Sequence, residues 1–373
     1  MIFGPENRTR ALRLIDEARE TFRLDLADMT VLTEAASAET VLGTLTAARA
    51  GSKRVCILPP EERFHRTDHG IDALMSLAER CGVADRIVPL TSRSDDAIGP
   101  VDIATYSGLA RPFDGKFLSR VKPTAVVPLL PPPWDGLPPD LDTASCHRLG
   151  LSILGIDSRA GQLQTLRYIG HAAIKRLYAA GLDVFRSRIV VFGSGEFARS
   201  IVSTLTFAGA DVDRMFCHRD ERTLSYPDES VLKHAEAVVI AEPHHDRLLL
   251  GRGGAVDPRW LAEQNPALIV VHLCGNADRS ALSAVGIDCA PQNFASAESL
   301  RLAGDFLGPR PLVDLHAAGL RVGQLLVEAR RSGLSAREAE DVVLNRCQFA
   351  RVVTDEHSAN AMRGTRREWR RAA

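Results

Sequence analysis

The run Gly193–Ala198, with the sequence GSGEFA, is the motif whose residue types and spacing could do the most specific chemistry. In a G-x-G-x-x-A pattern the first glycine permits a tight turn, the second lets a pyrophosphate approach the main chain, and the alanine allows close helix packing. The motif directly follows the apolar run RIVVF and opens the helical pattern ARSIVSTLTF. This order of strand, turn and helix predicts a dinucleotide site formed by Gly193, Ser194, Gly195, Glu196, Phe197 and Ala198.

The end of the next expected strand, near Cys217, bears on which dinucleotide binds. NAD needs an acidic residue for its ribose hydroxyls, whereas NADP needs cations for its 2′-phosphate. His218 and Arg219 occupy the expected place, Arg222 lies close by, and Asp220 is the only early acid. These residues favour NADP and leave NAD possible; the alternative interpretation is an exposed arginine in an arginine-rich chain.

Two further segments end expected strands in the same half of the chain. Glu242 and Pro243 follow the run AVVIA, and Cys274 and Gly275 follow IVVHL. Because ligands of open α/β sheets bind at the carboxyl ends of the strands, we expect these four residues at the cofactor. The two histidines after Pro243 do not predict a metal site, since adjacent loop residues seldom bind one ion together.

The elements that position these residues belong to an α/β chain. Short apolar runs alternate with amphipathic segments from residue 29 to residue 157 and again after residue 186, which predicts parallel sheets built from β-α units. We therefore expect two doubly wound parallel-sheet domains, the first flavodoxin-like and the second Rossmann-like, with a helical C-terminal segment. The expected limits are a substrate-binding domain at 1–160, a connecting helix at 161–185, a dinucleotide domain at 186–316, and C-terminal helices that return to the first domain, with a basic tail, at 317–373.

Composition excludes several other classes of protein. The 373 residues carry a formal charge of −1, and 45% are hydrophobic and 25% charged, as in ordinary globular proteins. Such a balance does not favour nucleic acid or a membrane surface as a partner. The seven cysteines are scattered without a C-x-x-C pair, and no signal pattern or spanning apolar stretch is evident. We expect a cytoplasmic protein with a small-molecule substrate and no metal.

The stretch PDLDTASCHRLGLSILGID adds a family resemblance. Asp140, Leu141, Asp142, Ala144 and Gly150 stand at positions that match the D-2-hydroxyacid dehydrogenases, the formate and glycerate dehydrogenase superfamily. The likeness continues through the glycine motif and covers about residues 101 to 323. It implies that the first domain binds substrate, that the second binds the dinucleotide, and that the active site lies between them.

The resemblance also implies catalytic residues. The motif LVDLHAAG resembles the segment that carries the family's proton donor, which gives His316, and Glu298 stands 18 residues upstream as the carboxylate that orients it. A helix-cap or core histidine is the alternative interpretation. Where the family has Asn-x-x-Arg-Gly this chain has LCGNADR, so the usual arginine is missing and Arg279 becomes the candidate substrate anchor. Alternatively, Cys274 and His272 line a remodelled pocket.

The expected substrate side lies at the ends of first-domain strands and in nearby loops. Its candidates are Thr33, Glu34, Ser107, Gly108, Arg111 and Trp134. Arg111 could meet an acidic substrate, and Trp134, in the loop PPPWDG, could form an apolar wall.

Three hypotheses about function follow. The first is an NADP-dependent oxidoreductase of specialised metabolism acting on a keto, hydroxy, imino or amino acid-like molecule. The second is a lyase, hydrolase or cyclase that holds NAD(P) tightly, as S-adenosylhomocysteine hydrolase does, and the third is a binding protein with a degenerate site. The resemblance implies a homodimer, in which the apolar stripe Leu320, Leu325 and Leu326 packs either between subunits or within the chain.

Overall fold

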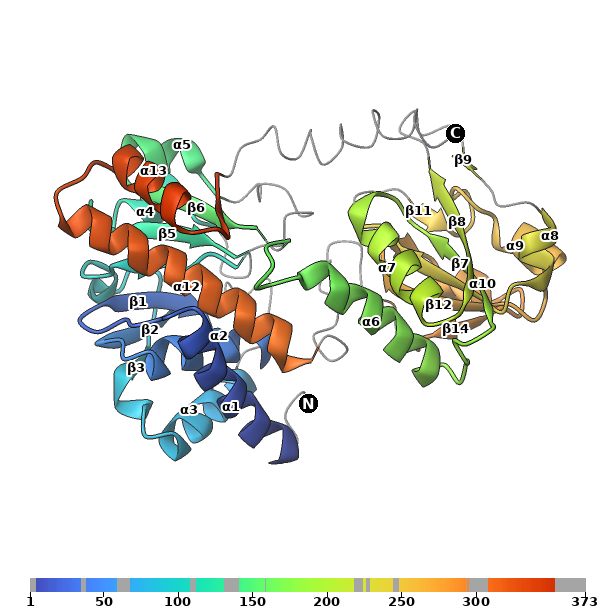
Figure 1. Cartoon of the computed structure of the whole chain (residues 1–373), viewed down its shortest axis with the longest axis horizontal. Helices are drawn as coiled ribbons and strands as arrows, with labels where there is room; N and C mark the ends of the chain where they lie inside the picture. Colours follow the sequence, from blue (N-terminus) through green and yellow to red (C-terminus); the bar gives the residue numbers. More distant parts are fainter. Residues whose placement is uncertain are drawn as a thin grey trace. The chain divides into compact units, whose positions relative to one another are not determined.

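The chain is divided into two compact units in the computed structural model, each described by itself (Figure 1). Unit 1 comprises Met1–Leu163 and Gly308–Ser358, and unit 2 comprises Gln164–Leu307 and Ala359–Ala373. The structure describes residues 5–34, 38–58, 68–107, 112–130, 141–157, 159–217, 224–225, 229–243, 248–292, 294 and 308–352.

The sheet of unit 1 has the strand order β15-β6-β5-β4-β1-β2-β3. Its strands are β1 (Thr30–Glu34), β2 (Arg54–Leu58), β3 (Ile87–Pro89), β4 (Ile103–Ala104), β5 (Val126–Leu129), β6 (Ser152–Ile156) and β15 (Ala350–Arg351). All pair in parallel except β15, which is antiparallel to β6. Strands β2-β1-β4-β5-β6 form the flavodoxin-like order, with β3 added at one edge. The chain therefore reverses its direction of sheet growth between β1 and β4, which is the switch point of unit 1.

Helices cover both faces of this sheet. They are α1 (Pro5–Thr21), α2 (Ala38–Arg49), α3 (Asp68–Arg80), α4 (Gly115–Leu118), α5 (Thr143–Arg148), α12 (Pro309–Arg331) and α13 (Ala336–Arg346), with short 3-10 turns η1 (Ala84–Arg86) and η2 (Asp96–Ile98). Side chains of α1, α2, α3, α12 and α13 share one apolar core with the sheet. Those of α4 and α5 share a second core on the opposite face.

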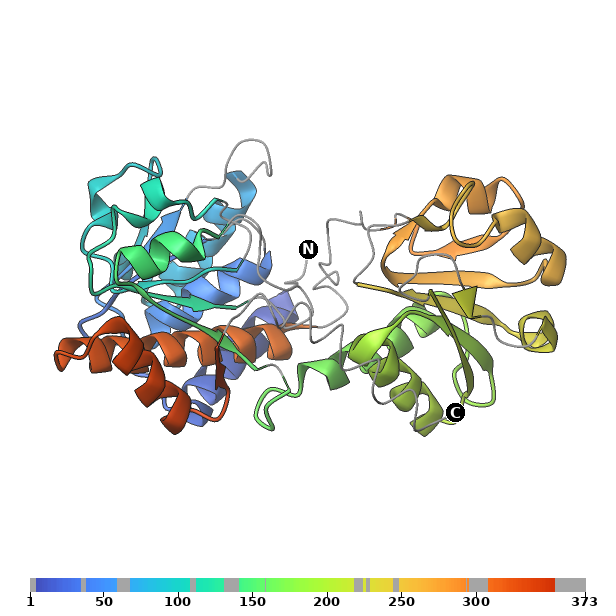
Figure 2. The same cartoon turned by 90° about the horizontal axis from the view of Figure 1, so that it is seen from above.

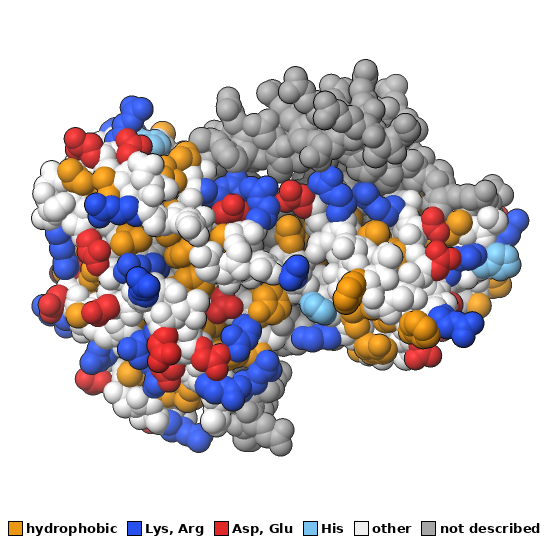
Figure 3. Space-filling model, in the orientation of Figure 1, with side chains coloured by type: hydrophobic (Ala, Val, Ile, Leu, Met, Phe, Trp, Pro, Cys, Tyr) orange, Lys and Arg blue, Asp and Glu red, His pale blue; other side chains and the backbone are white. Residues whose placement is uncertain are grey.

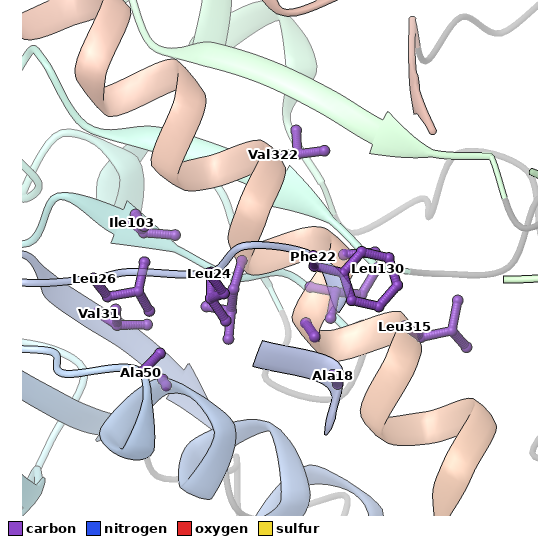
Figure 4. Close-up of a cluster of buried hydrophobic side chains, with 14 of the residues drawn as sticks. Ala18, Phe22, Leu24, Leu26, Val31, Ala50, Ile103, Leu130, Leu315 and Val322 are labelled. Carbon is purple, nitrogen blue, oxygen red and sulfur yellow. The ribbon is translucent and has the colours of Figure 1, made fainter. Parts of the chain in front are cut away.

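Helix α12 is the central helix of the first core. Leu315 and Val322 of α12 pack near Phe22, Leu130 and Ile103, which come from elements far apart in the sequence (Figure 4). A side chain at position 323 would place its Cβ 2.9 Å from Ile103 Cγ2, so glycine there allows the helix to lie close to β4. The approach fixes α12 firmly against the sheet of unit 1.

The predicted apolar stripe of α12 packs within the chain. Leu320 and Leu326 are 2% and 0% exposed, and Leu325 packs against the same core. The next helix, α13, begins with the predicted capping box, in which Ser335 and Glu338 exchange hydrogen bonds. Both helices therefore belong to unit 1, although the chain reaches them after unit 2.

The sheet of unit 2 has the order β14-β12-β10-β7-β8-β9. Its strands are β7 (Arg188–Phe192), β8 (Asp211–Cys217), β9 (Leu224–Ser225), β10 (Ala237–Ala241), β12 (Ile269–Cys274) and β14 (Asp288–Ala290), and a separate parallel pair is formed by β11 (Leu248–Leu250) and β13 (Asn276–Ala277). All strands of the main sheet run parallel except β9. This is the Rossmann order, with its switch point between β7 and β10.

Helices also lie on both faces of the second sheet. They are α6 (Thr165–Ala179), α7 (Gly195–Phe207), α8 (Glu229–His234), α9 (Pro258–Gln264) and α10 (Arg279–Ser283). In Figure 2 the green helices α6 and α7 lie on one face of this sheet and the yellow and orange helices on the other. Two sheets of this kind confirm the predicted fold class.

The surface carries charges of both signs. In Figure 3, Lys and Arg side chains are interspersed with Asp and Glu over the visible face, as the near-neutral composition implies. None of the helices in the described ranges is long and apolar enough to cross a bilayer.

Candidate functional site

The glycine motif forms the turn between β7 and α7, at the switch point of unit 2. A Cβ at position 193 would lie 2.1 Å from the carbonyl oxygen and 2.7 Å from the carbonyl carbon of Ala241, which ends β10. Real Cβ atoms do not approach main-chain atoms so closely, so only glycine fits between the two strands. Gly195 has φ of +65°, a left-handed conformation that glycine adopts without strain. Both predicted glycines are therefore required by the geometry of the turn.

The N-terminus of α7 follows this turn directly. Ser194 is the N-cap residue in an extended conformation, and its side chain makes no capping hydrogen bond. Phe197 and Ala198 are buried, which seats the first turn of the helix on the sheet. Main-chain amides at a helix N-terminus carry partial positive charge and bind anions. The turn is thus suited to an anionic group, although Glu196 adds a carboxylate to the same helical turn.

Two oppositely charged side chains, Glu242 and Arg214, lie beside the turn. Glu242 follows β10 and is 1% exposed. Arg214, on β8, donates from Nη2 to the carbonyl oxygen of Gly193 at 3.4 Å. Burial lowers the pKa of Arg214 and nearby Arg199 lowers it further, whereas the negative charge of Glu242 opposes both effects. The sequence did not predict Arg214 at this site, because it lies inside β8, three residues before the strand end at which ligand-binding groups are expected.

The end of β12 completes this edge of the sheet. The register between β10 and β12 shifts, so that Ile240 pairs with His272 but Ala241 pairs with Cys274. Gly275 has φ of +109°, and a Cβ there would lie 3.1 Å from the carbonyl oxygen of Glu242. The structure therefore brings the predicted Gly193, Glu242, Cys274 and Gly275 together, with Pro243 following Glu242.

His272 is held inside unit 2. It is 2% exposed, its Nε2 lies 2.7 Å from the carbonyl oxygen of Gly275, and its ring stacks on Phe294 at 4.4 Å between centroids. Burial lowers its pKa to about 4. The ring is therefore neutral near pH 7, and Nε2 carries the hydrogen because a carbonyl only accepts. Cys274 is buried as well, so the side chains of His272 and Cys274 are both enclosed within unit 2.

Arg279 lies away from the glycine turn. It is the first residue of α10, donates from Nη2 to Gln292 Oε1 at 2.6 Å, and lines an open cavity of about 450 Å³ beside the edge strand β14. Two strands separate β14 from β7, which corresponds to roughly 14 Å at the usual spacing between strands. Within unit 2, the candidate anchor and the candidate cofactor turn are therefore separate features.

A second candidate edge lies at the switch point of unit 1. Glu34 ends β1 and is 2% exposed, and the hydroxyl of Ser107, just after β4, donates to Glu34 Oε1. Thr33 is buried beside it, and Thr105 Oγ1 donates to the carbonyl oxygen of Leu32 at 3.1 Å. Three of the predicted substrate residues, Thr33, Glu34 and Ser107, thus gather at the carboxyl ends of β1 and β4.

His316 lies on α12 in unit 1, whereas the expected domain limits place it at the end of the dinucleotide domain. It is 9% exposed, and its ring lies over Gly43 of α2, where a Cβ would be 2.5 Å from Nδ1. The next residue of α2, Thr44, has its Oγ1 3.4 Å from the carbonyl oxygen of Glu34 and 3.4 Å from that of Thr40. Helix α2 therefore links the candidate histidine to the candidate substrate edge within one unit.

The remaining predicted site residues lie outside the described part of the chain. They are Gly108, Arg111, Trp134, His218, Arg219, Arg222 and Glu298. Across the residues that are described, no three His, Cys, Asp or Glu side chains gather into a group that could hold a metal ion.

Comparison with known proteins gives a likeness of fold. No protein-family model matches the chain, and no curated protein matches it in sequence. A dipicolinate synthase chain from Bacillus subtilis is 11% identical, with 83% of this chain and 99% of that chain covered and a TM-score of 0.50. The corresponding dipicolinate synthase protein from Bacillus halodurans is also 11% identical, with coverage of 81% and 99% and a TM-score of 0.48.

Dehydrogenases stand among the other matching structures. The 3-phosphoglycerate dehydrogenase of Entamoeba histolytica is 8% identical, with 83% of this chain and 97% of that chain covered and a TM-score of 0.39. At 11% identity and a TM-score of 0.50, the match to the Bacillus subtilis dipicolinate synthase chain shows a similar fold.

Proposed function

We propose that this chain is an NAD(P)-dependent oxidoreductase that acts on a keto, hydroxy, imino or amino acid-like small molecule. The observation that carries the proposal is the 2.1 Å approach that a Cβ at position 193 would make to Ala241. It supports a dinucleotide site because this close approach fixes the turn at the switch point, directly before the start of α7, where amide groups can bind a phosphate. The cofactor-binding set comprises Gly193, Ser194, Gly195, Glu196, Phe197, Ala198, Glu242, Pro243, Cys274 and Gly275.

The preferred cofactor in this proposal is NADP. His218, Arg219 and Arg222 follow the end of β8, where cations select the 2′-phosphate. We further propose a homodimer in the cytoplasm, and size-exclusion chromatography with light scattering tests the dimer.

His316 is the proposed acid and base, with Glu298 as its orienting carboxylate and Arg279 as a substrate anchor. The bound nicotinamide supplies or accepts the hydride. An imidazolium at His316 would give its proton to the substrate's carbonyl or imino group and take it back in the reverse direction. The contact of the His316 ring with Gly43 of α2, next to the Thr44 that bonds Glu34, supports this role because that helix leads to the substrate edge.

A fluorescence titration of the full-length protein with NADPH and NADH tests the proposal, after mass spectrometry has shown whether nucleotide co-purifies. We expect tighter binding of NADPH, and loss of that preference in Arg219→Ala. Gly195→Val should weaken both cofactors at least about tenfold, since a β-branched residue does not adopt φ near +65° without strain. Gly253→Val is the matched control, because Gly253 lies in the same unit with φ of +74° and no neighbour within 4 Å of its Cβ.

Absence of binding by an empty preparation would refute the proposal. Equal weakening by Gly195→Val and Gly253→Val would show that general strain, and not the turn, is responsible.

A second candidate function is a non-redox enzyme that retains NAD(P) through its reaction. The observation that favours it is Cys274-Gly275 at the place of the family's substrate arginine, with Arg279 beside β14 instead. Nucleotide that co-purifies and never appears as free NAD(P)H during turnover would support this candidate over the first.

A further inference from the structure

Three hydroxyl groups lie at or beside the switch point of unit 1, and each has an acceptor on β1 within hydrogen-bond distance. Ser107 donates to the carboxylate of Glu34, Thr44 donates to the carbonyl oxygen of Glu34 at 3.4 Å, and Thr105 donates to that of Leu32 at 3.1 Å. These acceptors belong to β1, but Thr44 Oγ1 is equally close, at 3.4 Å, to the carbonyl oxygen of Thr40 in its own helix. Because a hydroxyl has a single hydrogen, each group has only oxygen lone pairs left for any other partner.

Ser107 is the one of these three hydroxyl-bearing residues that solvent reaches. Thr44 and Thr105 are buried at 0% and 7% exposure, whereas Ser107 is half-buried. Its oxygen is backed by the carboxylate of Glu34, which accepts hydrogen bonds and donates none when ionised. A hydroxyl that donates to a carboxylate becomes a stronger acceptor, since hydrogen bonds in a chain polarise one another. The accessible residue therefore offers an acceptor with a carboxyl group behind it.

This acceptor lies at the part of the sheet where ligands usually bind in open α/β folds. Open α/β sheets bind ligands outside the carboxyl ends of the strands at the switch point, and Glu34 and Ser107 stand on its two sides. Helix α2 connects the same edge to His316 through Gly43 and Thr44. A carbonyl oxygen of a 2-oxo acid would face Ser107 acceptor to acceptor, whereas an ammonium or hydroxyl would donate to it.

We propose that unit 1 binds the amino-bearing form of its ligand, a 2-amino acid, with the ammonium donating to Ser107 Oγ and Glu34 supplying the charge behind it. The inference rests on the proposed function only for the acid-like class of the ligand. A 2-hydroxy acid donates one neutral hydrogen bond at the same place and binds less tightly, and a 2-oxo acid binds least.

Isothermal titration calorimetry on the full-length protein without nucleotide tests this order. The probes are two matched triples, alanine, lactate and pyruvate, and glutamate, 2-hydroxyglutarate and 2-oxoglutarate, with both enantiomers where they exist. We expect the amino acid of at least one triple to bind about tenfold or more tighter than its oxo acid, as a charge-assisted hydrogen bond implies. The hydroxy acid should lie between them.

Variants of Ser107 and Glu34 test whether these two residues cause the preference for the amino acid. Ser107→Ala should remove it, Ser107→Thr should retain it, and Glu34→Gln should weaken the amino acid more than the hydroxy acid. Ser119→Ala is the matched control, because Ser119 is an exposed serine whose hydroxyl donates to Lys116 O at 2.9 Å. It should change nothing.

Three results would overturn the inference. In the first, an oxo acid binds as tightly as the matching amino acid. In the second, the preference for the amino acid persists in Ser107→Ala. In the third, none of the probes binds. NADPH titration of the same preparation separates this failure from failure of the proposed function. An amino-acid preference that persists in Gly195→Val, which should bind nucleotide poorly, shows that the unit 1 site stands independently of the dinucleotide site.

Discussion

Replacement of Gly193 by alanine tests the close approach on which the dinucleotide site depends. The added Cβ would lie 2.1 Å from Ala241 O, whereas ordinary contacts begin at 3.4 Å, so β7 and β10 would have to separate by more than about 1 Å. The obstructing atoms are main chain and have no alternative rotamer. Overpacking costs roughly 1 to 3 kcal/mol, and we expect the upper end of that range because both strands lie in the centre of the sheet.

Urea unfolding followed by circular dichroism measures this loss of stability, and NADPH fluorescence measures its effect on the cofactor. Because Glu242 continues directly from Ala241, separation of the strands should also raise the Kd of NADPH at least about tenfold. Gly161→Ala is the control, since no atom lies within 4 Å of its Cβ and its φ is not positive. A Gly193→Ala protein with the urea midpoint and Kd of the parent would refute the argument.

Three other changes have defined outcomes. Gly43→Ala should displace the His316 ring, because Nδ1 of that ring would lie 2.5 Å from the new Cβ. In steady-state kinetics, turnover should fall about tenfold or more while the affinity for NADPH stays unchanged. Unchanged turnover would exclude His316 from the reaction. His272 has a pKa of about 4 against 6.5 for an unperturbed histidine, so the unfolded chain binds more protons between these values. Stability should therefore fall as pH drops from 6.5 to 4, and urea unfolding across this range should show a flatter profile for His272→Gln; an identical profile would contradict the burial argument. Asp102→Ala should lower the free energy of unfolding by roughly 1 to 3 kcal/mol in thermal denaturation, because the Thr30 amide loses the buried acceptor that lies 2.8 Å away and the partly exposed Lys122 and Arg331 lose their partner. A loss below about 0.5 kcal/mol would show that water replaces these contacts.

The features of unit 2 that could be predicted from the sequence are local. The turn at Gly193 and Gly195 depends on the strand just before it and the helix just after it, so a few consecutive residues define it. The ends of β10 and β12 could be predicted for a similar reason, because apolar runs of five or six residues mark buried parallel strands. Their convergence follows from strand order, which the family resemblance supplied.

The position of His316 could not be obtained in this way. Sequence distance places it next to unit 2, but α12 carries apolar residues that unit 1 buries, and the contact with Gly43 joins residues that lie far apart in the chain. A glycine inside a predicted helix carries no sign of what packs on it. Arg214 was missed for a related reason, since its link to the Gly193 carbonyl depends on the pairing of β7 with β8.

The two switch points differ in the groups that they offer to a ligand. In unit 2 the edge is made from main chain, because Gly193 leaves no room for a side chain and the side chain of Ser194 makes no capping hydrogen bond, so the start of α7 offers amide groups, which donate. In unit 1 the edge is made from side chains, and Ser107 has given its hydrogen to Glu34, so the free group accepts. Donors match the anionic end of a dinucleotide and an acceptor matches an ammonium. The two edges therefore suit two different ligands. In unit 1, the part of the ligand that faces Ser107 should be a donor such as an ammonium, and not the ligand's carboxylate.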